Sequence, residues 1–256
     1  MILVTNDDGI EARGIHALAQ ALTHIGDVMV VAPDRDRSGI GHAISLDTPL
    51  RARSRSPKGK EAARWAVDGT PTDCVYLGLY QLLPRKPDLV VSGINHGPNL
   101  ADDVLYSGTV GGAMEGAHAG ISSMAVSLAA HRPKDFAPAA EFAVAVAQMV
   151  LQRGLAPRTL LNVNVPDTDG APVAQYRWTR AGIRDYGPTV TEATDPRHRP
   201  YYWIGADFLG FHGKPGSDCD AVEEGLATIT PLTLDLTDEQ QLKGFSAVDL
   251  PGFNRG

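Results

Sequence analysis

Short apolar runs alternate with amphipathic stretches along the first two thirds of the chain. The runs are rich in β-branched residues and predict buried strands at 2–5, 28–32, 88–92, 124–128 and 160–165. Apolar residues at helical spacing predict helices at 14–25, 71–83, 109–118 and 136–152. Strands and helices that alternate in this way are typical of an α/β fold, in which a mostly parallel sheet carries helices on both faces.

The pattern changes after residue 172. Turn residues become frequent, aromatic residues cluster at 201–203, and the stretch 227–236 alternates threonine with apolar residues, as a half-exposed strand does. We therefore predict an α/β core over 1–172 and an antiparallel, β-rich C-terminal extension over 173–256, together forming one structural unit. The aromatic cluster suits a subunit interface, which assigns the extension to oligomerisation.

Composition and charge exclude several classes of protein. Hydrophobic residues make up 43% and charged residues 21% of the 256 residues, which is ample for one core and excludes a disordered chain. The formal net charge of −7 argues against nucleic-acid polymers and anionic membranes as partners. The N-terminus lacks the features of a signal peptide, and no apolar run approaches the roughly 18 residues of a membrane span. We expect a cytoplasmic protein whose two cysteines, Cys74 and Cys219, are unpaired.

A basic stretch over 51–64 contains six basic residues and one glutamate. We favour a solvated hairpin or loop for it. The alternative is a basic rim that steers a phosphorylated substrate towards its site.

Polar clusters follow three of the predicted strands, where ligands bind in open parallel sheets. The first is Asn6–Gly9, which contains the adjacent carboxylates Asp7 and Asp8. Two such carboxylates repel each other, and a turn at Gly9 can bring both towards one hard cation that offsets the repulsion. The alternative is that Asp7 or Asp8 caps the next helix.

The second cluster is Ala32–Gly41, which follows the second strand. Ser38 offers a hydroxyl oxygen, while Gly39 and Gly41 let backbone N–H groups approach an anion. The third glycine of a dinucleotide fingerprint is missing and the loop follows the wrong strand, so we reject that interpretation. An ordinary turn is the alternative.

The third cluster is a long polar connection over 92–109, and such connections inside compact domains are usually functional. Asn95 and Asn99 supply neutral oxygen or amide groups. The segment Ser107–Thr109 places hydroxyl and N–H groups at a helix N-terminus, which is a natural phosphate site. His96 could donate a proton to a leaving oxygen. A plain N-cap is the alternative for Thr109, and we favour solvated charge or capping for the aspartates at 102 and 103.

Together, these segments resemble the signature segments of the SurE family, which are stationary-phase survival proteins and metal-dependent 5′-nucleotidases. The similar segments are Val4–Ile10, Ala32–Gly39, Gly69–Val75, Ser92–Asn95, Tyr106–Val110 and Asp218–Ile229. The resemblance covers nearly the whole chain. It implies a Rossmann-like core, and a homodimer or homotetramer in the cytoplasm whose subunits exchange the C-terminal extension.

The resemblance also implies a reaction and a set of site residues. The reaction is hydrolysis of nucleoside monophosphates to nucleoside and phosphate, with 3′-nucleotides and short polyphosphate as further candidate substrates. One divalent cation per subunit, Mg²⁺ or Mn²⁺, would be held by residues that map onto Asp7, Asp8, Ser38 and Asn95, of which Asp7 and Asp8 are also the catalytic pair. The phosphate-binding groups map onto Gly39, Ser107, Gly108 and Thr109, with Asn99 nearby.

Two positions depart from the family pattern, and two mechanisms stay open. Ala101 stands where the family usually has glycine, and His96 where a small residue is common. In one mechanism a water activated at the metal site attacks phosphorus, and one aspartate, preferably Asp8, orients or deprotonates it. In the other, Asp7 or Asp8 forms an aspartyl-phosphate. A nucleotide- or metal-binding sensor without turnover is the alternative function, and charge disfavours a nucleic-acid-binding protein.

Overall fold

A computed structural model describes residues 1–130, 133–186, 190–205, 208–212, 215–246 and 248. A nine-stranded sheet runs through the molecule in the order β3-β4-β2-β1-β5-β6-β7-β13-β8. Its parallel centre consists of β1 (Ile2–Thr5), β2 (Val28–Pro33), β5 (Leu89–His96), β6 (Ser123–Ala129) and β7 (Thr159–Pro166). These strands are the five that the apolar runs predict, so the α/β prediction is confirmed.

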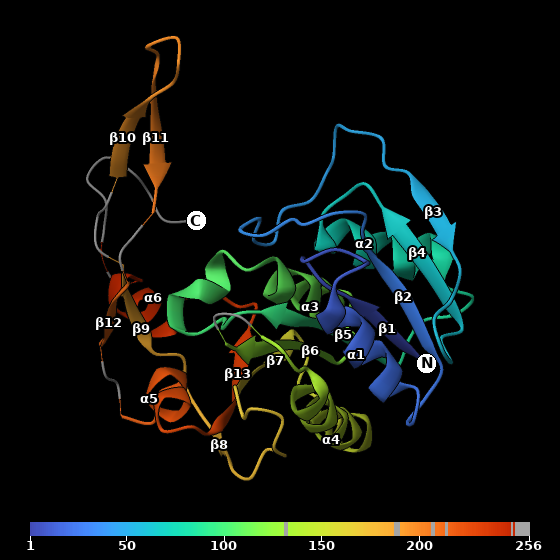
Figure 1. Cartoon of the computed structure of the whole chain (residues 1–256). Helices are drawn as coiled ribbons and strands as arrows, with labels where there is room; N and C mark the ends of the chain where they lie inside the picture. The colour runs from blue at the N-terminus through green and yellow to red at the C-terminus, as the bar shows by residue number, and fades with distance from the viewer. Residues whose placement is uncertain (131–132, 187–189, 206–207, 213–214, 247, 249–256) are drawn as a thin grey trace.

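Helices cover both faces of the sheet (Figure 1). On one face α1 (Arg13–Leu22) packs against α4 (Ala137–Arg153), and on the other α2 (Pro71–Leu77) packs against α3 (Gly108–His118). Successive side chains of β1 therefore enter different cores: Ile2 and Val4 join the first, and Leu3 the second. Burial on both faces explains why the central strands are continuous apolar runs.

Two further strands complete the sheet at each end. At one end β4 (Ala63–Val67) pairs with β2 in parallel, and β3 (Ala52–Arg55) pairs with β4 in antiparallel orientation. At the other end β13 (Ala227–Thr233) pairs antiparallel with β7 and parallel with β8 (Tyr176–Trp178). The prediction of a half-exposed strand at 227–236 is wrong for its first four residues, which are buried because β13 lies inside the sheet.

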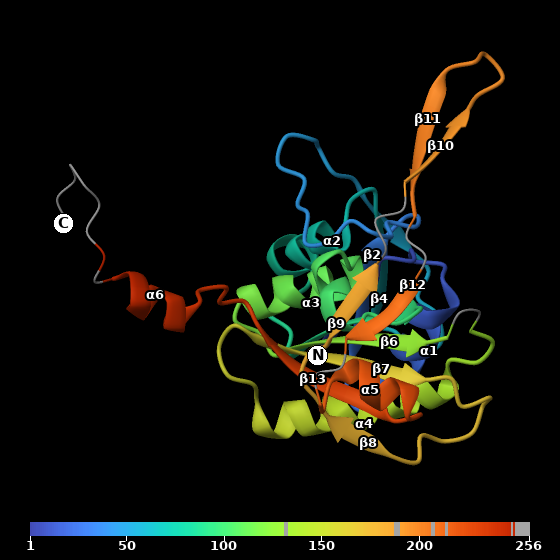
Figure 2. The ribbon, with the colours of Figure 1, turned by 90° about the vertical axis from the view of Figure 1, so that its left-hand side faces the viewer.

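The rest of the C-terminal extension stands further out. Antiparallel pairs join β9 (Ile183–Tyr186) to β12 (Phe208–His212) and β10 (Val190–Thr194) to β11 (Pro200–Ile204). The helices here are α5 (Asp218–Glu223), which contacts β13, and α6 (Glu239–Phe245). Figures 1 and 2 show the β10–β11 hairpin rising from the body, and Figure 2 shows α6 lying to one side of the body. The domain boundary at residue 172 stays a prediction.

The basic stretch over 51–64 forms the β3–β4 hairpin, but one of its residues is not solvated. The Arg64 side chain is fully buried and makes a bidentate ion pair with Glu61, with N···O distances of 2.6 and 2.8 Å. Its Nη1 also donates to the Ile10 carbonyl at 2.8 Å. Arg64 thus connects β4 to the turn after β1. None of the six basic residues lines the polar cavity that is described below as the candidate site.

Two further expectations concern sulfur and membranes. Cys74 and Cys219 are buried and unpaired. Within the described parts of the chain, no helix combines the length and apolar character needed to cross a membrane.

Candidate active site

Polar side chains from three neighbouring strand ends meet in one cavity of about 350 Å³. They meet because β1 lies between β2 and β5 and all three strands are parallel, so their C-terminal loops share one edge of the sheet. The residues that line the cavity are Asp7, Asp8, Ser38, Gly39, Asn95, His96, Gly97, Pro98, Asn99, Asp103, Tyr106, Ser107 and Arg184.

Most of the predicted site residues line this cavity. The four predicted metal ligands do so, as do Gly39, Asn99 and Ser107 of the predicted phosphate site. Gly108 and Thr109 do not line it, because they lie behind Asp7 at the start of α3.

The N-terminus of α3 holds the Asp7 carboxylate in place. The Thr109 N–H donates to Asp7 Oδ2 at 3.0 Å, and the Thr109 hydroxyl donates to Asp7 Oδ1. Gly108 permits this approach, since a Cβ atom there would lie 2.8 Å from the Asp7 Cβ. The cap of α3 is Ser107, whose Oγ accepts from the Val110 N–H, and α1 has no side-chain cap. Asp7 therefore binds the start of α3 and does not cap α1.

Burial and mutual repulsion dominate the electrostatics of the two aspartates. Burial raises the pKa of Asp7, although the hydrogen bond from the Thr109 hydroxyl acts in the opposite direction. Burial and the adjacent Asp7 charge together raise the pKa of Asp8 to about 7. Two carboxylates in this environment are unfavourable as a pair of anions, and a nearby divalent cation would offset that penalty.

The two neutral ligands are oriented so that an oxygen is available. The Ser38 hydroxyl donates to Asp36 Oδ1 at 2.6 Å, so its proton points towards Asp36 and the lone pairs of its oxygen can bind a cation. The Asn95 Nδ2 donates to the Gly97 carbonyl at 2.9 Å, which leaves Oδ1 as the ligand atom. An oxygen-only set of two carboxylates, a hydroxyl and an amide fits a hard cation such as Mg²⁺ or Mn²⁺. In the described part of the chain no group of three or more His, Cys, Asp or Glu side chains is placed to bind a metal ion.

His96 extends β5 by one residue beyond Asn95 and touches Asp8. Its backbone N–H donates to Asp8 Oδ2 at 3.3 Å, and its Nδ1 lies 3.8 Å from Asp8 Oδ1. The imidazole ring packs on Phe136, with 4.9 Å between the ring centroids. Phe136 thus accommodates a ring at a position where the resemblance leads us to expect a small residue.

Buried asparagines fix the loop that carries Asn99. The Asn99 N–H donates to Asn164 Oδ1 at 2.8 Å, and the Asn99 carbonyl accepts from Asn162 and Asn164 at 2.8 and 3.0 Å. The Asn99 Nδ2 donates to Ser127 Oγ at 2.8 Å. Sequence reasoning missed these anchors, although polar residues at alternate positions of a strand buried on both faces were a usable signal.

The departure at Ala101 coincides with an unusual backbone conformation. Ala101 begins the short 3₁₀ helix η2 (Ala101–Leu105) with φ of 51°, a conformation that glycine adopts more readily. Its N–H donates at 3.0 Å to Oδ2 of Asp218, a fully buried residue at the start of α5. This bond helps to hold an alanine at a position where the resemblance leads us to expect glycine.

Asp103 and Arg184 are the site residues whose role the sequence did not reveal. The expectation of a solvated charge at Asp103 is wrong, because its carboxylate is almost buried and forms an ion pair with the Arg184 guanidinium from β9. The exposed Asp102 accepts from the Arg184 backbone N–H at 3.1 Å. No local pattern relates these positions, which are 81 residues apart.

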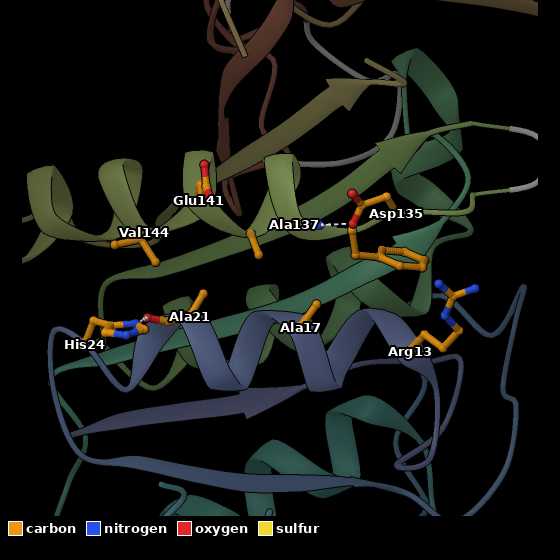
Figure 3. A pocket seen from close by; sticks show the side chains of 10 residues that line it. Arg13, Ala17, Ala21, His24, Asp135, Ala137, Glu141 and Val144 are labelled. Atoms are coloured by element: carbon orange, nitrogen blue, oxygen red, sulfur yellow. Dashed lines mark hydrogen bonds between the residues drawn. The ribbon is translucent and has the colours of Figure 1, made fainter. Parts of the chain in front are cut away.

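A larger cavity lies elsewhere, but its lining is mostly apolar. It is a groove of about 510 Å³ between α1 and α4. Figure 3 shows Ala17 and Ala21 of α1 facing Val144 of α4, with Glu141 turned away from the groove and Asp135 bound to the Ala137 N–H. The smaller polar cavity is therefore the candidate active site.

Comparison with known proteins places the chain in a family. The model of the family described as Survival protein SurE matches residues 2–188. The chain belongs to the SurE family. It is 53% identical over 242 residues to the 5′-nucleotidase SurE of Geobacter metallireducens, covering 94% of each chain. It is 52% identical to the 5′-nucleotidase SurE of Anaeromyxobacter dehalogenans, covering 99% of this chain and 98% of that relative.

Structural comparison agrees with this assignment. The crystal structure of the SurE protein from Aquifex aeolicus matches with a TM-score of 0.82 at 43% identity, covering 96% of this chain and 98% of that one. The resemblance predicted from the polar segments is thus confirmed, and the SurE fold accounts for the sheet and for the strands of the extension.

The contact between Thr109 and Asp7 leads to a test by substitution. Thr109→Val removes the hydroxyl donor but keeps the shape of the side chain, so Asp7 should be held less firmly. We expect Mn²⁺, measured by isothermal titration calorimetry, to bind about 10–100-fold more weakly to this variant. Thr109→Ser keeps the hydroxyl and should bind Mn²⁺ as the unmodified protein does. Equal Mn²⁺ affinity in all three proteins would contradict the assigned role.

Proposed function

We propose that this SurE-family protein is a divalent-metal-dependent 5′-nucleotidase, which hydrolyses nucleoside monophosphates to nucleoside and phosphate in the cytoplasm. Relatives that share half of its residues over nearly the full chain are named 5′-nucleotidase SurE. The observation that carries the proposal is the convergence of Asp7, Asp8, Ser38 and Asn95 in one polar cavity that Ser107, the cap of α3, also lines.

The donor set of the cavity suits one Mg²⁺ or Mn²⁺ ion per subunit. Asp7, Asp8, Ser38 and Asn95 would hold it through oxygen atoms, and all four lie in the cavity lining. When bound, such an ion supplies positive charge that neutralises the phosphate and makes water a stronger nucleophile. The adjacent buried carboxylates are themselves an argument for a cation, because without one their charges repel each other in a site with little water.

The two aspartates have different surroundings and so suit different roles. Both carboxylate oxygens of Asp7 accept hydrogen bonds from Thr109, which makes Asp7 a fixed ligand. Asp8 also lines the cavity but accepts a longer hydrogen bond, at 3.3 Å from the His96 N–H, so it is held less firmly and is better placed to orient the attacking water and take its proton. This difference favours attack by water over an aspartyl-phosphate at Asp7.

The phosphoryl group would be bound on the side of α3. Ser107 lines the cavity and caps this helix, whose N-terminus attracts anions. Gly39 also lines the cavity, so its backbone N–H would be a second donor to the phosphate oxygens. Removing one such donor in an enzyme typically raises the activation free energy by about 2.7–4 kcal/mol. The role of His96 as proton donor to the leaving oxygen stays a prediction.

Phosphate release from a panel of nucleoside monophosphates tests the proposed function directly. The protein loaded with Mn²⁺ or Mg²⁺ should release phosphate, and EDTA should abolish the release until the ion is restored. A sensor that uses the same cavity would be stabilised by nucleotide and metal but would release no phosphate. Absence of turnover with every nucleotide and either ion would therefore favour the sensor.

Asp7→Asn and Asp8→Asn provide the matched control proteins for this assay. Each keeps the size of the side chain and removes one negative charge, so the fold should survive while turnover falls below detection. Circular dichroism should show an unchanged spectrum. Near-normal phosphate release by either variant at saturating Mg²⁺ would refute the assignment of that aspartate.

We further propose that the protein is a homodimer or homotetramer assembled through its extension. The β10–β11 hairpin, the connection that precedes α6, and α6 itself expose large apolar side chains, namely Tyr202, Trp203, Ile204, Leu236, Leu242 and Phe245. Large apolar side chains gathered on projecting elements are typical of subunit interfaces. Sedimentation equilibrium should give two or four times the mass of one chain, and a monomer at micromolar concentration would contradict this.

A further inference from the structure

The polar cavity contains a positive charge to which the resemblance and the family comparison assign no role. Among the lining residues that the structure describes, Arg184 alone carries a permanent positive charge. It comes from β9 in the C-terminal extension, whereas the other lining residues belong to the α/β core. Three of those core residues, Asp7, Asp8 and Asp103, are carboxylates.

Arg184 is held at the cavity by contacts along its whole length. Its backbone N–H donates to Asp102, its guanidinium pairs with Asp103, and its Cζ atom lies 5.9 Å from the centre of the Phe211 ring. Only 17% of the side chain is exposed. A surface arginine would sample many rotamers, but these contacts restrict Arg184 to one region of the cavity wall.

A buried carboxylate joins the two segments that meet at this ion pair. Asp218 accepts from the Gly182 N–H at 2.8 Å and from the Ala101 N–H at 3.0 Å. Gly182 lies two residues before Arg184, and Ala101 lies two residues before Asp103. The extension and the η2 turn are therefore fixed to each other next to the guanidinium and its partner.

The charges of the cavity call for a cation beyond the metal ion. A phosphomonoester brings close to two negative charges into a cavity that already holds several carboxylates. A guanidinium has five N–H donors in a planar fork, so it can bind a carboxylate and a phosphate oxygen at the same time. Asp103 belongs to the turn just before the cap of α3, since the Ser107 N–H donates to the Asp103 carbonyl at 3.1 Å.

We propose that Arg184 binds the phosphoryl group of the substrate, and that Asp103 is the positioning residue that aims the guanidinium at it. The site of the core is then completed by an arginine from the extension. Arginine stabilises the charge that develops on a transferring phosphoryl group. This inference rests on the proposed function, to which it adds a catalytic residue.

Kinetics of Arg184 variants in the full-length, Mn²⁺-loaded protein test this inference, with AMP as substrate. Arg184→Ala should lower kcat/KM by about 100–1,000-fold and should weaken inhibition by inorganic phosphate. Free guanidinium ion should restore part of the lost activity. Arg184→Lys should retain more activity than Arg184→Ala, because a single charge remains, and Asp103→Asn should lie between wild type and Arg184→Ala.

Arg177→Ala is the matched control. Arg177 also lies in the extension and forms a bidentate ion pair, with Glu224, but it is only half-buried on β8 and does not line the cavity. Its kcat/KM should equal that of wild type, and guanidinium should not affect it. Equal Mn²⁺ affinity in wild type and the Arg184 variants would show that the metal site is intact.

Two results would overturn the proposal. One is an Arg184→Ala protein within threefold of wild type in kcat/KM. The other is a loss of activity that guanidinium does not restore while inhibition by phosphate is unchanged, which would indicate a structural role.

Should Arg184→Ala not fold, Arg184→Lys and Asp103→Asn decide by the same two readouts. Should wild type hydrolyse no nucleotide, the proposed function fails, and calorimetric titration of Mn²⁺-loaded wild type and Arg184→Lys with inorganic phosphate still tests this inference, since equal affinity would refute it.

Discussion

Asp7 and Asp8 place two carboxylates side by side in a buried turn at the end of β1. Several of the surrounding groups offset the repulsion between these two charges. Burial removes water that would solvate these charges and so raises the pKa of both carboxyl groups. The N-terminus of α3 offsets part of this penalty at Asp7 through N–H and hydroxyl donors and the helix dipole. A divalent cation would compensate for what remains, and Ser38 and Asn95 bring neutral oxygens into the same cavity.

The fold positions this turn through contacts that span the sheet. Arg64 of β4 binds the carbonyl of Ile10, just after the turn. On the opposite side, asparagines of β7 hold the Asn99 loop, and Asp218 holds η2 against the start of β9. These anchors are buried and hydrogen-bonded, which lets polar loops keep one conformation without a large apolar contact. The extension is therefore part of the site as well as a candidate interface.

The central strands and the polar clusters could be predicted because both follow local rules. A strand buried on both faces is a continuous apolar run, and ligands in parallel sheets bind after strand ends. The sequence indicated Thr109 as a site residue but not its hydrogen bond to Asp7. That bond depends on how α3 packs against the turn after β1. Arg64 and Arg184 depend on partners 54 and 81 residues away, which no periodicity encodes. The buried half of β13 was missed for the same reason: its place between β7 and β8 is set by long-range pairing.

The central claim is that oxygens from the three loops after β1, β2 and β5 hold one cation beside the phosphoryl group. A crystal structure of the protein soaked with Mn²⁺ and inorganic phosphate, with anomalous scattering recorded to locate manganese, tests it most directly. We predict a single anomalous peak within bonding distance of Asp7, Asp8, Ser38 and Asn95, with phosphate beside it. A manganese peak elsewhere, or these four side chains pointing apart around an empty cavity, would contradict the account.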